Sequence, residues 1–204
     1  MVGDFIYNLR DKLSDTEEPY LWSDNELISY VNYVIKDIIA NTGFLQDNYP
    51  FNTSKDVMSY SLPSDFFRIK SVYCDGLPLA FIPYSMVHYN AFNVSAKPKF
   101  YTYNKENIYL LPTPDDIYSV NVVYEATLGA DLTANDTIPL REEWMFLLLY
   151  GVMWQAYLKD DTETFNQKAQ YYEAQYRDAL KRFKNFIVRN NNFNYTIPVH
   201  RGLI

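Results

Sequence analysis

Residues 138–189 read IPLREEWMFLLLYGVMWQAYLKDDTETFNQKAQYYEAQYRDALKRFKNFIVR, the densest and most regular apolar pattern in the chain. The first half of this stretch, residues 144–158, is apolar almost all round, which is typical of a buried central helix. Charged residues close the run on both sides, so it is shorter than the about 20 apolar residues that span a membrane. We therefore expect a core helix and no membrane association.

The second half of the same stretch predicts an amphipathic helix, because its apolar residues recur every three or four positions and so share one face. Asp160 and Glu163 have the spacing of a capping box at its start. The short link at residues 159–161 makes the two helices an antiparallel hairpin. We predict that Leu147 and Trp154 of the first helix are buried against this face and against an N-terminal helix. The residues of the face are Phe165, Ala169, Tyr172, Tyr176, Leu180, Phe183 and Ile187.

The N-terminal part of the chain predicts two more helices, since residues 5–13 and 27–38 carry apolar side chains at helical spacing. Ser23 and Glu26 form a capping box before the second of them, and residues 41–43 supply a stop signal. Each of these helices has an apolar face that needs a partner. The apolar helix at residues 144–158 is the partner that we expect.

Between the helical parts the apolar period changes to two, which is typical of strands. Asp75-Gly76 marks one hairpin turn, and residues 100–103 and 108–111 form a second hairpin. The sequence thus predicts an α+β fold that is mainly a helical bundle. We expect one domain at residues 1–189, followed by an extended C-terminal arm at 190–204. Within the domain the bundle comprises residues 1–49 and 138–189, and a β-rich insertion comprises residues 50–137.

The composition argues against several classes of protein. A net charge of -7 and a sequence pI of about 4.8 do not suit a protein that binds by neutralising phosphates. The single cysteine, Cys74, excludes an internal disulfide. The first residues lack the basic and apolar regions of a signal peptide. We expect a soluble protein that is synthesised in a reducing cytoplasm.

Residue patterns for catalysis or cofactor binding are also missing. His88 and His200 have no second ligand at metal-binding spacing, and the six glycines are too scattered for a phosphate-binding loop. Asp115 and Asp116 with Glu125 suggest a nuclease only if a lysine stood at position 127, which is threonine. A turn between strands explains the two aspartates better. We expect neither an enzyme nor a cofactor.

One ordered set of motifs is more specific than its parts. It comprises WSDNEL at 22–27, YSLPSDFFRI at 60–69, DG at 75–76, IYLLPTP at 108–114, VVY at 122–124 and IP at 138–139. This order resembles the head-to-tail adaptor proteins, also called connector or ring proteins, of tailed bacteriophages, particularly short-tailed ones. The resemblance covers roughly residues 5–185. It implies a helical bundle with a β insertion in a twelve-subunit ring below the portal, located in the virion neck.

The resemblance also implies the partners of such a ring. They are the portal protein, a downstream tail or nozzle protein, and genomic DNA that passes through the lumen without sequence-specific binding. A second hypothesis from another class is a cytoplasmic module that binds a peptide or protein through its β insertion.

The C-terminal arm supplies the candidate partner-binding residues. Phe193, Tyr195, Ile197 and Val199 alternate, as in a strand that buries one side, and Arg201 could meet an acidic partner. Adding a strand to a neighbour's sheet or filling a groove would use that alternation. An arm folded back on its own bundle is the alternative.

Overall fold

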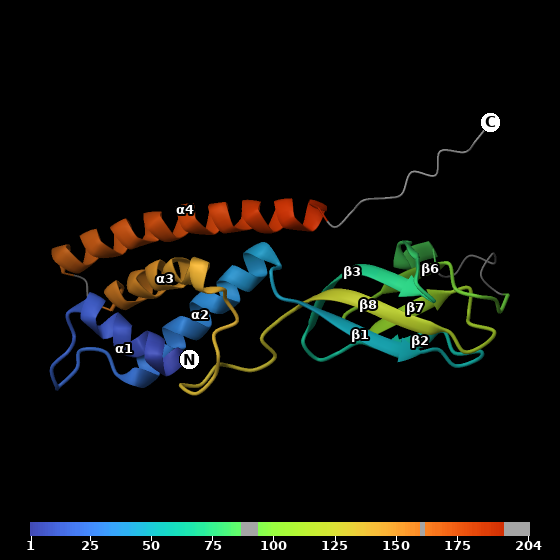
Figure 1. Cartoon of the computed structure of the whole chain (residues 1–204), viewed down its shortest axis with the longest axis horizontal. Coiled ribbons are helices and arrows are strands. Elements are labelled where there is room, and N and C mark those ends of the chain that lie inside the picture. The colour runs from blue at the N-terminus through green and yellow to red at the C-terminus, as the bar shows by residue number, and fades with distance from the viewer. Residues whose placement is uncertain (87–93, 160–161, 194–204) are drawn as a thin grey trace. The chain divides into compact units, whose positions relative to one another are not determined.

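The computed structural model describes residues 1–86, 94–159 and 162–193. The chain divides into two compact units, a helical unit of residues 1–42 and 130–204 and a β unit of residues 43–129. Figure 1 shows the four described α-helices in the first unit, and both sheets with a short 3₁₀ turn, η1 (Tyr84–Met86), in the second. The predicted α+β class is thereby confirmed.

Helices α1 (Val2–Leu13) and α2 (Asp24–Thr42) form the N-terminal half of the helical unit. The capping box before α2 is confirmed, because the Ser23 N–H donates to Glu26 Oε2 at 2.8 Å and the Glu26 N–H donates to Ser23 Oγ at 3.3 Å. The helix ends as predicted, with Gly43 at φ +57°. A side chain at this glycine would also meet the Glu125 carboxylate at 2.5 Å, so both space and conformation require glycine here.

Helices α3 (Met145–Tyr157) and α4 (Glu163–Phe193) form the C-terminal half, and a 3₁₀ turn, η3 (Glu142–Trp144), precedes α3. The rings of Tyr157 and Phe165 lie 5.3 Å apart, and those of Trp144 and Phe183 lie 4.8 Å apart. The end of α3 therefore meets the start of α4 and the start of α3 meets its later part, so the two helices pack antiparallel. The predicted cap residue Asp160 lies outside the described residues.

The burial predicted for α3 is confirmed at one position and wrong at the other. Leu147 is completely buried, but Trp154 is only half-buried. Helices α2 and α4 both approach α3 closely at Gly151, where an added Cβ would lie 2.5 Å from Val34 and 3.0 Å from Tyr176. Trp154 lies three residues further along and is left at the rim of that contact.

The β unit contains two sheets of mostly antiparallel strands. The first sheet has the order β1-β8-β3-β4, and the second has the order β2-β7-β6-β5. The hairpins predicted at Asp75-Gly76 and at residues 100–111 are confirmed by the pairings β3 with β4 and β6 with β7. The strands are β1 (Gln46–Asn52), β2 (Ser59–Ser61), β3 (Phe66–Cys74), β4 (Leu77–Pro78), β5 (Ala80–Phe81), β6 (Phe100–Tyr103), β7 (Asn107–Leu111) and β8 (Ser119–Ala126).

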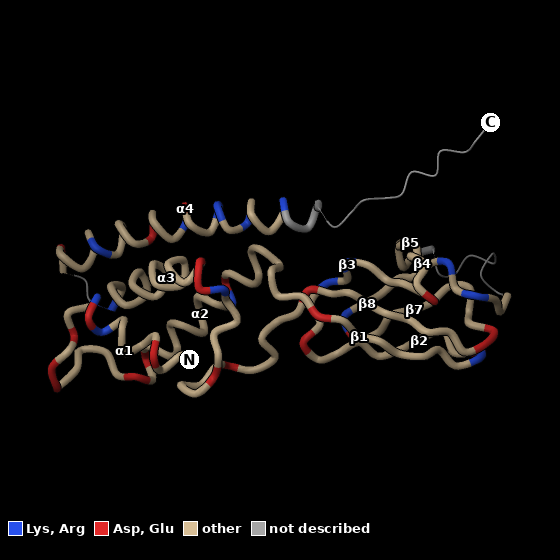
Figure 2. Tube along the Cα trace, in the orientation of Figure 1, with Lys and Arg blue, Asp and Glu red and all other residues tan. Residues whose placement is uncertain are grey.

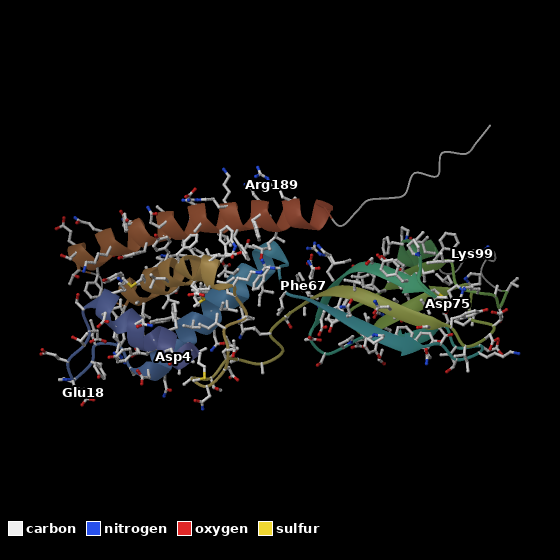
Figure 3. The ribbon with its side chains drawn as sticks, viewed as in Figure 1. Asp4, Glu18, Phe67, Asp75, Lys99 and Arg189 are labelled. Carbon is white, nitrogen blue, oxygen red and sulfur yellow. The ribbon has the colours of Figure 1, made fainter. Side chains whose placement is uncertain are left out.

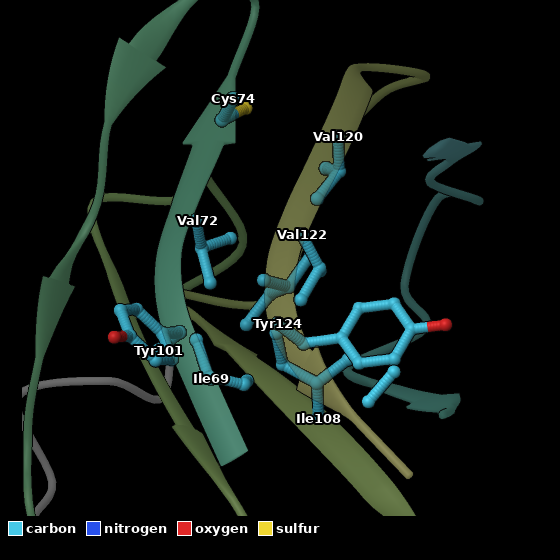
Figure 4. Close-up of a cluster of buried hydrophobic side chains, with 10 residues drawn as sticks. Ile69, Val72, Cys74, Tyr101, Ile108, Val120, Val122 and Tyr124 are labelled. Carbon is cyan, nitrogen blue, oxygen red and sulfur yellow. The ribbon is translucent and has the colours of Figure 1, made fainter. Parts of the chain in front are cut away.

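The β-rich part starts earlier than the predicted residue 50, because of strand β1. It begins at Gln46, inside the stretch that we assigned to the bundle, because it pairs along its whole length with β8. Its polar residues 46–48 show no apolar alternation, so the sequence did not reveal it. Buried side chains from β3, β6, β7 and β8 form the hydrophobic core of the β unit (Figure 4). They include Ile69, Val72, Cys74, Tyr101, Ile108, Val120, Val122 and Tyr124.

Candidate assembly surfaces

The predicted partner-binding residues lie mostly beyond the described part of the chain. Phe193 is the last residue of α4, whereas Tyr195, Ile197, Val199 and Arg201 lie outside the described residues. The extended arm predicted to begin at residue 190 begins later, because α4 continues through Phe193. Extending a formed helix adds one hydrogen bond per residue, which offsets the weak helix propensity of the asparagines at 190–192.

The acidic residues considered for catalysis have structural roles. Glu125 is buried on β8 and pairs with Arg68 at 2.7 Å and Lys70 at 3.0 Å. Asp115 and Asp116 lie in the connection between β7 and β8, as predicted, at the opposite end of β8. Asp115 accepts a hydrogen bond from the Tyr118 hydroxyl at 2.7 Å, which raises the pKa of Tyr118 to about 12. These carboxylates do not converge on one site.

The remaining described residues give no other sign of a catalytic centre. They contain no group of three or more His, Cys, Asp or Glu residues that could hold a metal ion. His88 and His200 lie outside the described part. Within the described ranges, no helix could span a lipid bilayer.

A shallow pocket of about 220 Å³ lies between α2 and α4 beside the half-buried Trp154. The Tyr176 hydroxyl donates to Asp37 Oδ2 at 2.5 Å, and burial raises the pKa of Tyr176 well above its ordinary value. The Trp154 ring lies 5.8 Å from that of Tyr176. This hydrogen bond and the ring contact fix the pocket wall, so it is a preformed concave feature of the helical unit. Its lining residues are Tyr33, Asp37, Asn41, Trp154, Tyr176, Arg177 and Leu180.

The loop end of the β unit, which we define as residues 53–58, 75–77, 94–97 and 113–118, is held together by hydrogen bonds. The buried Thr53 hydroxyl accepts from the Tyr118 N–H at 2.7 Å and donates to the Asp116 carbonyl at 2.9 Å. Asp75 accepts from Lys97 Nζ at 2.6 Å, and this bond lowers the pKa of Asp75 (Figure 3 labels the residue). The loops are thus fixed relative to one another.

Aliphatic side chains project from the same loop end. Leu77, Val94 and Ile117 are 63%, 66% and 69% exposed, and Val57 is 41% exposed. The chain enters the β unit at Gly43 and leaves it at Gly129, and both points lie at the other end of β1 and β8. An ordered surface with several exposed aliphatic residues marks a protein-contact site more often than isolated ones do.

The outer edge of β1 is poorly suited to the addition of another strand. The Thr53 N–H bonds the Tyr118 carbonyl and the Leu45 carbonyl bonds the Ala126 N–H, so the odd-numbered residues of this strand face β8. The backbone N–H and C=O groups of Asn48 and the C=O group of Pro50 therefore point away from β8, toward the unpaired edge of the sheet. The Asn48 N–H is already bound by Asp47 Oδ1 at 2.7 Å, and proline has no N–H. Such features block edge-to-edge pairing.

The sequence was also compared with known proteins and protein families. None of the curated proteins matches the chain. A sequence model described as SU10 adaptor protein matches residues 2–196, a range that includes the whole β unit and most of the helical unit. The chain therefore belongs to the SU10 adaptor protein family.

Proposed function

We propose that this protein is a structural head-to-tail adaptor of a tailed-phage virion. In this proposal twelve copies form a ring below the portal, join the capsid to the tail and let genomic DNA pass through the lumen. The family match over residues 2–196 is the observation that carries the proposal. The described surfaces are compatible with this function, since the loop end of the β unit is ordered and exposes hydrophobic side chains, and the described carboxylates do not converge on one site.

Two parts of the chain are suited to the partners of such a ring. The loop end of the β unit is rigid and bears Leu77, Val94 and Ile117, which supports a contact with a downstream tail or nozzle protein. Residues 194–204 alternate apolar and polar side chains and include Arg201, which supports a contact with the portal. The antiparallel packing of α3 and α4 gives the helical unit a firm frame.

The net charge of -7 suits a channel through which DNA passes. A protein that holds DNA gains affinity by neutralising phosphates with Lys and Arg, and this chain has fewer of them than Asp and Glu. Genomic DNA would therefore move past the ring without being retained.

The alternative, a cytoplasmic module that binds a peptide through the β unit, has less support. The simplest such mode adds a strand to an open sheet edge. Asn48 and Pro50 block the free edge of β1, and β2 at another edge is only three residues long. The adaptor is therefore the better-supported function.

Particles made without this protein test the proposal. We expect DNA-filled heads that carry a portal but no tail, and we expect purified protein to restore tail attachment when it is added back. A variant truncated after Phe193 should keep the wild-type melting temperature but lose portal attachment. Tails that attach normally in the absence of the protein would refute the adaptor function. A truncated variant that melts early yet binds the portal would show that residues 194–204 belong to the protein's own fold.

A further inference from the structure

Charge is unevenly distributed over the helical unit (Figure 2). Residues 1–42 contain eight Asp and Glu residues against three Lys and Arg, whereas residues 177–189 contain five Lys and Arg residues against one Asp. The net negative charge of the chain is enough to keep it soluble, so solubility does not explain this basic segment. It points to a partner of opposite charge.

We define the basic face of α4 as Lys181, Lys184, Val188 and Arg189. All four side chains are exposed, and Val188 is 51% exposed. The three cations have no ion pair or hydrogen bond among the described residues, whereas neighbouring Arg177 and Arg182 pair with carboxylates on α4 itself. Cations near a helix C-terminus are stabilised by the helix dipole, but that effect is confined to the last turn. Lys181 and Lys184 lie further from the end of α4 at Phe193, so the dipole does not account for them.

We define the acidic face as Tyr7 and Asp11 of α1 together with residues 17–21 of the following loop. Tyr7, Tyr20 and Leu21 are 75%, 41% and 50% exposed, so the face combines carboxylates with a large apolar area. The carboxylates of Asp11, Glu17 and Glu18 are exposed and have no hydrogen-bond or ion-pair partner among the described residues.

Buried Arg10 holds the acidic face in place. Its guanidinium donates to Asp15 at 2.8 Å and to the Trp22 carbonyl at 3.0 Å, and it stacks 3.8 Å from the centre of the Tyr20 ring. These contacts fix both ends of the loop that carries Glu17 and Glu18. The face is therefore preformed, which lowers the entropic cost of binding a partner.

The two faces lie far apart on the helical unit. Leu21 of the acidic face is bonded by Lys159 next to the start of α4, whereas the basic face lies on the later part of that helix. Helix α1 packs on α2, α2 packs on α3, and α3 packs on α4. Figure 1 shows α2 and α3 between α1 and the later part of α4. The basic and acidic faces of one molecule therefore cannot meet each other, although two molecules can bring them together.

We infer that neighbouring copies of this chain associate through the basic face of α4 on one subunit and the acidic face on the next. Contact between two different faces is head-to-tail, and repeated contacts of this kind close into a ring when the rotation allows it. Tyr7, Leu21 and Val188 would supply apolar burial, while the charges fix orientation and exclude other pairings. This inference rests on the proposed function, because it specifies how the adaptor ring is built.

Charge reversal followed by mixing tests the interface. Lys181→Glu with Lys184→Glu makes both faces acidic, and Glu17→Lys with Glu18→Lys makes both faces basic. Each variant alone should form rings on purified portal at least about tenfold less well than wild type, because like charges face each other. An equimolar mixture should restore assembly, since each variant then meets the opposite charge. Lys99→Glu with Lys105→Glu, two exposed positions of the β unit, is the matched control and should assemble normally.

Native mass spectrometry of the portal complexes gives the number of bound copies, and carbodiimide cross-linking of mixed isotope-labelled subunits locates the contact. We expect cross-links between Lys181 or Lys184 of one copy and Glu17 or Glu18 of another. Full rings from either variant alone would overturn the interface while leaving the adaptor function intact. Full rings of the lysine variant with altered DNA retention would instead place the basic face toward DNA. Failure of wild type to assemble on portal would overturn both proposals.

Discussion

For single residues, a role that follows from spacing along the chain was predictable, whereas a role that follows from tertiary contacts was not. Ser23 and Glu26 form a capping box whose spacing alone identifies it. Arg10 was not predicted, although it interrupts the buried face of α1 between Ile6 and Leu13. A charge at such a position needs buried partners, and Asp15 supplies one only after the loop has folded.

Two tryptophans of the helical unit provide a matched test of hydrogen bonding. The indole N–H of buried Trp22 donates to the Ala156 carbonyl at 3.0 Å, whereas the buried indole N–H of Trp144 has no hydrogen-bond partner in the described part of the chain. Trp22→Phe removes this hydrogen bond, whereas the Ala156 carbonyl keeps the one that it accepts from the Lys159 N–H at 3.2 Å. The loss of one such bond typically costs about 0.5–1.5 kcal/mol. Trp144→Phe loses no such bond. Urea unfolding of both variants should show the larger loss of stability for Trp22→Phe, and equal losses would contradict the assigned bond.

At the scale of elements, the two helical halves were predictable from their apolar period, but the exposure of individual side chains was not. The uniformly apolar α3 indicated burial all round, yet its contacts leave Trp154 only half-buried beside a pocket. Which faces of a helix are covered depends on the neighbours that reach it. Strand β1 was missed for a similar reason, since pairing with β8 and not its own pattern makes it a strand.

The crossing of α2, α3 and α4 at Gly151 depends on the absence of a side chain. A Cβ there would lie 2.5 Å from Val34 Cγ1 and 3.0 Å from the Tyr176 ring. Overpacking of this kind costs about 1–3 kcal/mol, which exceeds the gain of about 1 kcal/mol in helix propensity on changing Gly to Ala. Gly151→Ala should therefore lower the melting temperature, and adding Val34→Ala should recover part of the loss. A Gly151→Ala variant that melts above wild type would show that the helices separate without cost.

The link between the start of α2 and the end of α3 should be sensitive to acid. The hydrogen bond from Lys159, followed by those from Ser23, lowers the pKa of Glu26 from 4.5 to about 2. A pKa that is lower in the folded state contributes stability that is present above pH 4.5 and is lost as the pH falls toward about 2.

Glu26→Gln keeps the shape of the side chain and removes its charge. Melting temperatures measured from neutral pH down to pH 2 should show wild type above this variant at neutral pH, with the difference vanishing in acid. A difference that is constant with pH would mean that the charge of Glu26 contributes nothing.

At the scale of the whole molecule, the order of motifs indicated the family, and the family model matches nearly the full chain. The division into units was harder to predict, because it depends on pairing between residues far apart in sequence. Gln46 of β1 pairs with Glu125 of β8, and this pairing brings the two ends of the β unit together. Neither residue carries a local signal for that contact. The C-terminal candidate residues remain a prediction from alternation alone.

As an adaptor, this chain should assemble on the portal as a closed ring. Native mass spectrometry of purified protein mixed with purified portal rings at micromolar concentration tests this assembly. We expect monomers in the absence of portal, because the net charge of -7 on each subunit opposes association, although the contact faces carry opposite charges. With portal present we expect a complex that carries twelve copies. A mixture in which portal rings keep their own mass, with no copies bound, would contradict the adaptor function.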